Sequence, residues 1–329
     1  MTVPIHAPKQ AREQLQHRQY ELRRLVLLHT LISLGFLILL TCIDYLLSVR
    51  IADLGGLSGL GSLSILETAQ TLLEYASALL VPFWELGMIA AAICFARKED
   101  AQPDVLPTAF RRFFPTLRMM LLRYLRYTIV IVLCAQLAAI LFVSTPLSLG
   151  LQNALAPLLT EHNLENPELL VELIMANLNI WDIVPFFGIL VVLLGVLFVP
   201  LFYRFRMANY LIVDAAHPKA FATLRASQLL MRGNCRALFL LDLKFWWYYA
   251  LRLVGMLLSA SHILLPMLGV NLPFSDDVAL FVSLGAYCVF SLGLNLWARG
   301  YVETSYAIVY DALLQESPLI PKKEVEEND

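Results

Sequence analysis

Charged residues are scarce in this sequence. Only 15% of the 329 residues are charged, while 59% are hydrophobic and the mean hydropathy is +0.69. This composition excludes an ordinary soluble globular domain and indicates an integral membrane protein. Two stretches, residues 144–182 and 261–277, contain no Lys or Arg at all. Because cytoplasmic loops are the ones enriched in cations, both stretches are predicted to lie on the outer side of the membrane.

The sequence also lacks the spaced motifs that carry catalysis or metal binding. Its five cysteines stand singly, without CxxC or CxxH spacing, which argues against a zinc site or a disulfide framework. There is no HExxH, GxSxG, Walker or GxGxxG motif, and the six histidines are scattered. The cations follow the predicted membrane boundaries instead of a groove, which argues against nucleic-acid binding. We therefore expect no catalytic residue, no metal, no cofactor and no enzymatic activity.

Long apolar runs dominate what remains. Since a membrane-spanning helix needs about 20 apolar residues, the sequence predicts six, at residues 25–47, 72–95, 116–143, 183–202, 237–259 and 278–298. Cations gather before the first run, between the second and third runs, between the fourth and fifth runs, and after the sixth run. Because cytoplasmic segments are the ones enriched in cations, both termini are expected in the cytoplasm. The expected fold class is an all-α, polytopic membrane bundle. It would comprise a cytoplasmic basic arm (1–24), a six-span domain (25–316) and a cytoplasmic acidic tail (317–329).

Short amphipathic helices are predicted to lie in the cytoplasmic interface. Leu106, Phe110 and Phe113 recur at helical spacing with arginines between them, the pattern of an interfacial helix. A second basic amphipathic segment ends at Gly233, where a helix C-terminus favours a residue with positive φ. Asn234 is then expected to cap the next helix, the fifth span. The sequence thus predicts a surface helix hinged to a membrane-crossing one.

The order of these elements suggests an internal repeat. An interfacial helix, an outbound span, an outer loop and an inbound span follow one another three times, and an Asp-Ala pair follows each inbound span, beginning at Asp100, Asp214 and Asp311. Two interpretations stay open: a three-fold repeat of helical hairpins, or three ordinary hairpins whose dipeptides agree by chance.

Ionisable residues at membrane depth are the main candidates for function, since each costs about 2.5–3.5 kcal/mol at the bilayer centre unless paired or hydrated. From the helical rise, Glu85 lies about 18 Å from Arg97, and Arg252 about 24 Å from Arg236, so the two have similar depths. We expect Glu85 and Arg252 to pair, with Asp44 as the competing partner. Such a pair would either fix helix register or belong to a proton or solute relay.

Asp242 lies one to two helical turns inside the predicted cytoplasmic boundary of the fifth span. We expect its carboxylate to contact a cation or a backbone group of a neighbouring inbound helix, and not a substrate.

Residues 200–313 resemble the C-terminal part of a bacterial membrane-protein family, domain of unknown function 975. The family pattern begins with a proline-interrupted span that leads to a Tyr and an Asp, here Pro200, Tyr210 and Asp214, and continues with a Ser, Met, Gly box, here Ser227, Met231 and Gly233. An aromatic-rich Leu, Phe, Leu, Asp, Leu run follows, here Leu238, Phe239, Leu241, Asp242, Leu243 and Phe245. The last element is an aromatic-rich cytoplasmic end, here Tyr301, Thr304, Ala307 and Tyr310. Lys244, Trp247 and Gly300 depart from the family pattern. The resemblance implies a multi-pass protein of the bacterial cytoplasmic membrane and supplies no catalytic residues.

Two functional classes follow from these features. The surface-lying helices and compact loops favour a non-enzymatic membrane scaffold or accessory subunit. Glu85, Arg252, Gln136 and the helix-breaking prolines favour the alternative, a transporter or channel for a small solute or lipid. The expected partners are anionic lipid headgroups at the cytoplasmic face, and a second membrane protein or another copy of this chain.

Overall fold

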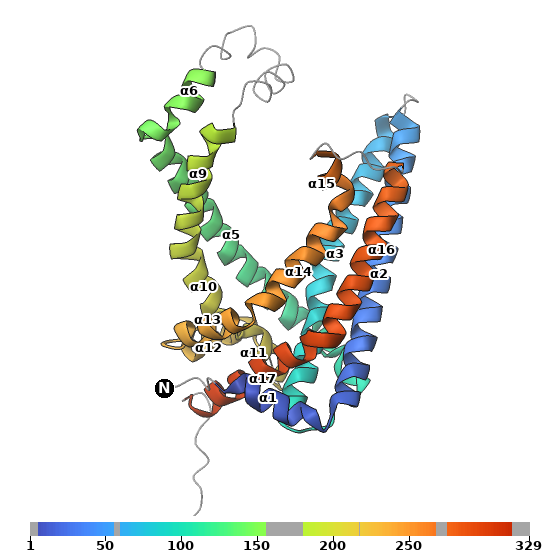
Figure 1. Cartoon of the computed structure of the whole chain (residues 1–329), viewed down its shortest axis with the longest axis vertical. Helices are drawn as coiled ribbons and strands as arrows, with labels where there is room; N and C mark the ends of the chain where they lie inside the picture. The colour runs from blue at the N-terminus through green and yellow to red at the C-terminus, as the bar shows by residue number, and fades with distance from the viewer. Residues whose placement is uncertain (1–5, 56–59, 156–179, 217, 268–274, 318–329) are drawn as a thin grey trace, which may run out of the picture. The chain divides into compact units, whose positions relative to one another are not determined.

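The computed structural model describes residues 6–55, 60–155, 180–216, 218–267 and 275–317, and every regular element in these ranges is helical (Figure 1). The predicted all-α class is therefore confirmed. The acidic tail beyond Ser317 and most of the outer loop at 144–182 lie outside the described residues.

The chain divides into two compact units. The first unit, Met1–Met119 with Met207–Asp329, contains these helices: α1 (Ala7–Gln16), α2 (Gln19–Gly55), α3 (Leu60–Ala96), η1 (Pro103–Val105), α4 (Thr108–Arg111), α11 (Ala208–Asp214), α12 (Ala220–Leu230), α13 (Cys235–Lys244), α14 (Trp246–Ser259), α15 (Ser261–Met267), α16 (Asp276–Leu294), η5 (Asn295–Arg299) and α17 (Gly300–Gln315). The second unit, Met120–Arg206, contains most of α5 (Phe113–Val143), with η2 (Pro146–Ser148), α6 (Leu149–Leu155), α9 (Ile180–Leu193), η4 (Leu194–Phe198) and α10 (Val199–Arg204).

Four helical stretches are long and apolar enough to cross a membrane: Gln19–Ile51, Phe113–Val143, Val184–Asp214 and Asp277–Gln315. They contain the predicted first, third and sixth spans and all but the first residue of the predicted fourth span. The end of the predicted second span forms the shorter apolar stretch Leu80–Ala96. Two of the four stretches include a π-helical turn, η4 and η5, and such turns frequently mark functional sites.

The predicted fifth span is not one helix. Its backbone breaks at Phe245 (φ −100°, ψ 14°), which divides it between α13 and α14, and a second break at Ala260 separates α14 from α15. Gly233 has φ +85°, as predicted for the hinge. Asn234 precedes α13 but its side chain makes no cap; its amide donates instead to the Leu230 carbonyl (3.1 Å) of α12. The hinge therefore joins α12 to the short helix α13, and the apolar helix of the bundle starts only at Trp246.

The core of the first unit lies where α1, α2, α3 and the η1 turn meet. Leu15, Leu25, Phe95 and Leu106 are among its buried members. Gly87 allows the η1 turn to approach α3 closely, since a Cβ on Gly87 would lie 2.1 Å from the Leu106 carbonyl oxygen. The predicted interfacial segment around Leu106 is thus anchored to α3: Leu106 is buried, while Phe110 and Phe113 are partly exposed and contact Phe83.

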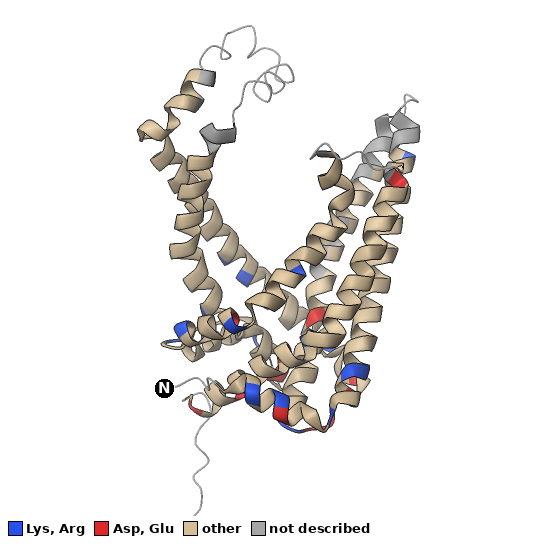
Figure 2. Ribbon diagram, viewed as in Figure 1, with Lys and Arg blue, Asp and Glu red and all other residues tan. Residues whose placement is uncertain are grey.

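Charged residues of the first unit gather toward the end that carries α1 and α17 (Figure 2). The middle stretches of α2 and α16 are nearly free of them, as expected for segments in contact with lipid. A few charges lie deeper between the helices, and they define the candidate site.

Candidate functional site

A cavity of about 440 Å³ opens between α2, α3, α14, α16 and η5 in the first unit. Its lining on α2 runs from Thr30 to Asp44, which is about 21 Å at 1.5 Å per residue. The middle of the cavity is apolar, with Leu37, Leu40 and Met256 among the lining residues. Charged groups lie at its two ends: Glu85, Arg252 and Arg299 at one, and Asp44 at the other. This is an elongated amphipathic site at membrane depth.

Glu85 and Arg299 form the ion pair at the charged end. An Nη of Arg299, on η5, donates to the Glu85 carboxylate of α3. The Arg299 side chain is 7% exposed and the Glu85 side chain 34% exposed, so the guanidinium is buried behind a carboxylate that faces the cavity. A buried guanidinium needs such a partner, since an unpaired charge there costs several kcal/mol.

His29 completes this end of the site. An Arg299 Nη lies 3.3 Å from His29 Nδ1, and His29 Nε2 lies 3.0 Å from the Trp84 carbonyl oxygen. The guanidinium requires an acceptor at Nδ1 and the carbonyl requires a donor at Nε2, so the imidazole is neutral with its proton on Nε2. The ring also stacks on Trp84, with centroids 5.1 Å apart.

The prediction that Glu85 pairs directly with Arg252 was wrong. Both residues line the same cavity, but Glu85 binds Arg299, and among the described side chains Arg252 has no hydrogen bond or ion pair. Asp44 does not compete for either one, because it accepts a hydrogen bond from Gln70 Nε2 (2.9 Å) at the far end of the cavity. Gln136 belongs to the second unit, where it is exposed on α5.

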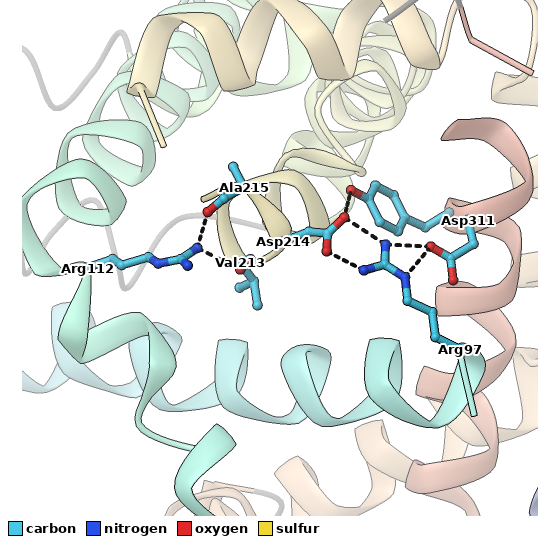
Figure 3. A network of polar contacts seen from close by, with 7 residues as sticks. Arg97, Arg112, Val213, Asp214, Ala215 and Asp311 are labelled. Carbon is cyan, nitrogen blue, oxygen red and sulfur yellow. Dashed lines mark hydrogen bonds and ion pairs between the residues drawn. The ribbon is translucent and has the colours of Figure 1, made fainter. Parts of the chain in front are cut away.

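A second charged cluster ties together the ends of three helices (Figure 3). Arg97, just after α3, binds both oxygens of Asp214 at the end of α11 (2.6 and 2.8 Å) and one oxygen of Asp311 on α17 (2.8 and 3.1 Å). Tyr310 also donates to Asp214 (2.8 Å). The hydrogen bonds to Asp214 raise the pKa of Arg97 above its ordinary value, so this arginine is permanently charged. We call these residues the arginine clip.

Arg112 holds the same helix end from the other side. One of its Nη atoms donates to the backbone carbonyls of Val213 (2.8 Å) and Ala215 (Figure 3). A cation at the C-terminus of a helix satisfies orphan carbonyls and complements the helix dipole. The aspartates that the repeat hypothesis singled out therefore have a structural role at Asp214 and Asp311, while Asp100 pairs with Arg18 (2.6 Å).

The sequence matches a protein family along nearly its whole length. A family model described as "Protein of unknown function (DUF975)" matches residues 1–317. The chain belongs to the DUF975 family. No curated protein and no solved structure matches it. The DUF975 match extends well beyond the residues 200–313 that carried the resemblance, and it includes every residue of the cavity and of the arginine clip.

The DUF975 motif residues have mainly structural surroundings. Ser227 and Met231 are fully buried on and just after α12. Asp242 accepts a hydrogen bond from the Tyr306 hydroxyl of α17, the helix that continues the predicted sixth, inbound span. Gly300, which departs from the family pattern, lets α17 pack against α2, since a Cβ there would lie 2.7 Å from the Leu22 side chain.

Sequence reasoning missed Arg299 and Arg97 as partners. Both lie at the ends of predicted spans, a position typical of boundary cations at the cytoplasmic membrane surface. The sixth span does not stop at Ala298, however, and continues through η5 into α17, which places Arg299 inside the bundle. Among the described residues no three potential metal ligands lie together.

Proposed function

We propose that this DUF975 protein binds a small anionic or zwitterionic molecule in the cavity lined by Glu85, Arg252 and Arg299, which we call the Arg252 cavity. The protein would then be a membrane transporter or channel for such a solute or lipid. The proposed setting is the bacterial cytoplasmic membrane, with six spans, both termini in the cytoplasm, and no enzymatic activity. Cations that gather toward one end of the first unit support this orientation.

The observation that carries the proposal is the charge balance at the end of the cavity that Glu85, Arg252 and Arg299 line. Two guanidinium groups, Arg252 and Arg299, face one carboxylate, Glu85, and the neighbouring His29 is neutral. Glu85 is committed to the buried Arg299. This leaves the positive charge of Arg252 without a direct partner among the described side chains. An arginine retained at membrane depth in a cavity marks a functional site by default.

A second polar group lacks a partner in the same cavity. Thr30 Oγ1 is buried and makes no hydrogen bond with any described residue, although the side chain lines the cavity. A helical threonine ordinarily bonds the carbonyl one turn earlier. The wall of the cavity thus contains a hydroxyl without a partner and a guanidinium without a direct partner among the described residues, and the two together suit an anionic group that accepts hydrogen bonds. A dry scaffold interior would need neither.

Mass analysis of copurifying molecules tests the proposal. The full-length protein, Arg252→Gln and the matched control Arg232→Gln would each be extracted from the host membrane into lipid nanodiscs without exchange of native lipids. Arg232 is an exposed cation at the hinge, so its removal changes net charge equally. We expect one anionic or zwitterionic species at about one molar equivalent in the wild type and the control, and a decrease of about tenfold or more in R252Q.

An identical profile of copurifying species in wild type and R252Q would contradict the proposal. Arg252→Lys keeps the charge but loses the planar guanidinium, and it should retain a measurable part of the bound species. A common folding defect is excluded by comparing the elution and thermal midpoints of all four proteins.

A further inference from the structure

A second cavity, of about 550 Å³, lies in the first unit between α1, α2, the start of α14 and the η5–α17 junction. It is separate from the Arg252 cavity in its lining: no residue lines both. Arg12, Gln19 and Arg23 contribute its polar side, and Trp247, Trp297 and Tyr301 its aromatic side. Its volume is within the range of small-molecule sites.

The cations of this cavity are not neutralised within the described structure. Arg12 and Arg23 are both exposed, and neither forms an ion pair with any described residue. The nearest acidic residue along α2, Glu21, is held by Arg18 (2.8 Å). Two arginines converging on one cavity without acids are suited to a phosphate group, which accepts charge-assisted hydrogen bonds from guanidinium forks.

The apolar part of the same cavity points to a lipid and not to a free anion. Leu22, Val26 and Leu296 line it beside the two tryptophans. Trp247 and Trp297 contact each other, with ring centroids 5.0 Å apart, and the Trp297 side chain is 70% exposed. Tryptophan is enriched at membrane interfaces, where its ring lies at the level of the headgroups.

The position of the cavity along the chain agrees with this assignment. Arg23 lies two residues before the first apolar run, which starts at residue 25, and Val26 of the lining is the second residue of that run. The polar side therefore lies where the sequence passes from the basic arm into the bilayer. We propose that this cavity binds the headgroup of an anionic phospholipid, with the phosphate on Arg12 and Arg23 and the acyl chains along Val26, Leu296 and Trp297.

Tryptophan quenching by brominated lipids tests the site directly, because two of the five tryptophans line it. The full-length protein would be reconstituted in phosphatidylcholine containing increasing fractions of phosphatidylglycerol brominated near the carbonyl end of its acyl chains. The reference titration uses equally brominated phosphatidylcholine. We expect a preference for the anionic lipid of about fivefold or more, and the variant W247F/W297F identifies the share of the signal that comes from this cavity.

The double variant Arg12→Gln, Arg23→Gln should lower the preference to about one, and Arg12→Lys, Arg23→Lys should restore most of it. The control Arg111→Gln, Arg232→Gln removes two exposed cations elsewhere and should keep the wild-type preference. Equal preference in the Arg12/Arg23 glutamine variant and the wild type would overturn the assignment. So would displacement of the brominated lipid by millimolar inorganic phosphate, since the site would then belong to a free anion.

Discussion

Replacing Arg97 by Gln should destabilise the protein more than any other change in the arginine clip. The guanidinium makes four hydrogen bonds, two to Asp214 and two to Asp311. Its removal leaves two carboxylates, 20% and 18% exposed, facing the same space without a cation. Removing one member of a buried pair costs about 3–5 kcal/mol, and partial exposure lowers that figure. We expect a loss of about 2–4 kcal/mol.

The clip also predicts an order and a coupling among its variants. Asp214→Asn should cost more than Asp311→Asn, because Asp214 uses both oxygens on Arg97 and also accepts from Tyr310, whereas Asp311 uses one oxygen. In the double variant R97Q/D214N, only the Asp311 carboxylate remains without its cation, whereas in R97Q both Asp214 and Asp311 do. The double variant should therefore be more stable than the sum of the single losses predicts, by about 1 kcal/mol or more.

Reversible unfolding by dodecyl sulfate in mixed micelles would provide these free energies. Arg111→Gln, which removes an exposed arginine from the neighbouring helix α4, is the matched control and should stay within about 0.5 kcal/mol of wild type. Strictly additive losses in the R97Q/D214N cycle, or an R97Q variant as stable as the control, would refute the reasoning.

Two further predictions concern packing and the Asp242 contact, measured in the same unfolding assay. Gly87→Ala should destabilise the protein by about 3 kcal/mol or more, because the added Cβ would lie 2.1 Å from a backbone oxygen that cannot move without displacing the η1 turn. The control Gly35→Ala, where the added Cβ would have no atom within 4 Å, should be neutral or slightly stabilising. Equal losses of stability at the two glycines would contradict the close packing of Gly87. Tyr306→Phe should cost about 1–2 kcal/mol, since the hydroxyl donates to Asp242 and lies 2.9 Å from the Tyr249 hydroxyl, whereas Tyr20→Phe, at an 81% exposed position, is the silent control.

The helical class and the membrane character followed from composition and apolar run length alone. The positive φ of Gly233 was predictable because few other residues tolerate that conformation. The break of the fifth span at Phe245 was not, since Phe245 is neither Pro nor Gly, and nothing in the local sequence distinguishes one apolar helix from two. The Asn234 side chain can cap α13 or donate a hydrogen bond to the preceding helix α12, and the local sequence does not show which of the two forms.

The candidate site was predictable in depth but not in pairing. Counting 1.5 Å per residue from a boundary cation gives the height of Glu85 and of Arg252, and both do line one cavity. It gives no information on how each helix is rotated about its axis. The π-helical turn at η5 changes that rotation and carries Arg299 into the bundle, where it takes the place that sequence reasoning gave to Arg252.

Two ion pairs join α3 and its end to η5 and α17, and neither of them includes Arg252. Glu85 and Arg97 lie twelve residues apart on α3 and its end, and Arg299 and Asp311 lie twelve residues apart on η5 and α17. The two bridges between these segments, Glu85 to Arg299 and Arg97 to Asp311, have opposite polarity and are about 18 Å apart. A slide of one helix along the other would bring like charges toward each other, so the bridges fix the register of α3 and α17. Arg252, on α14, takes part in neither bridge. Loss of Arg97 should therefore affect stability first, whereas loss of Arg252 should affect the bound molecule first, and the two variants separate the frame of this site from its function.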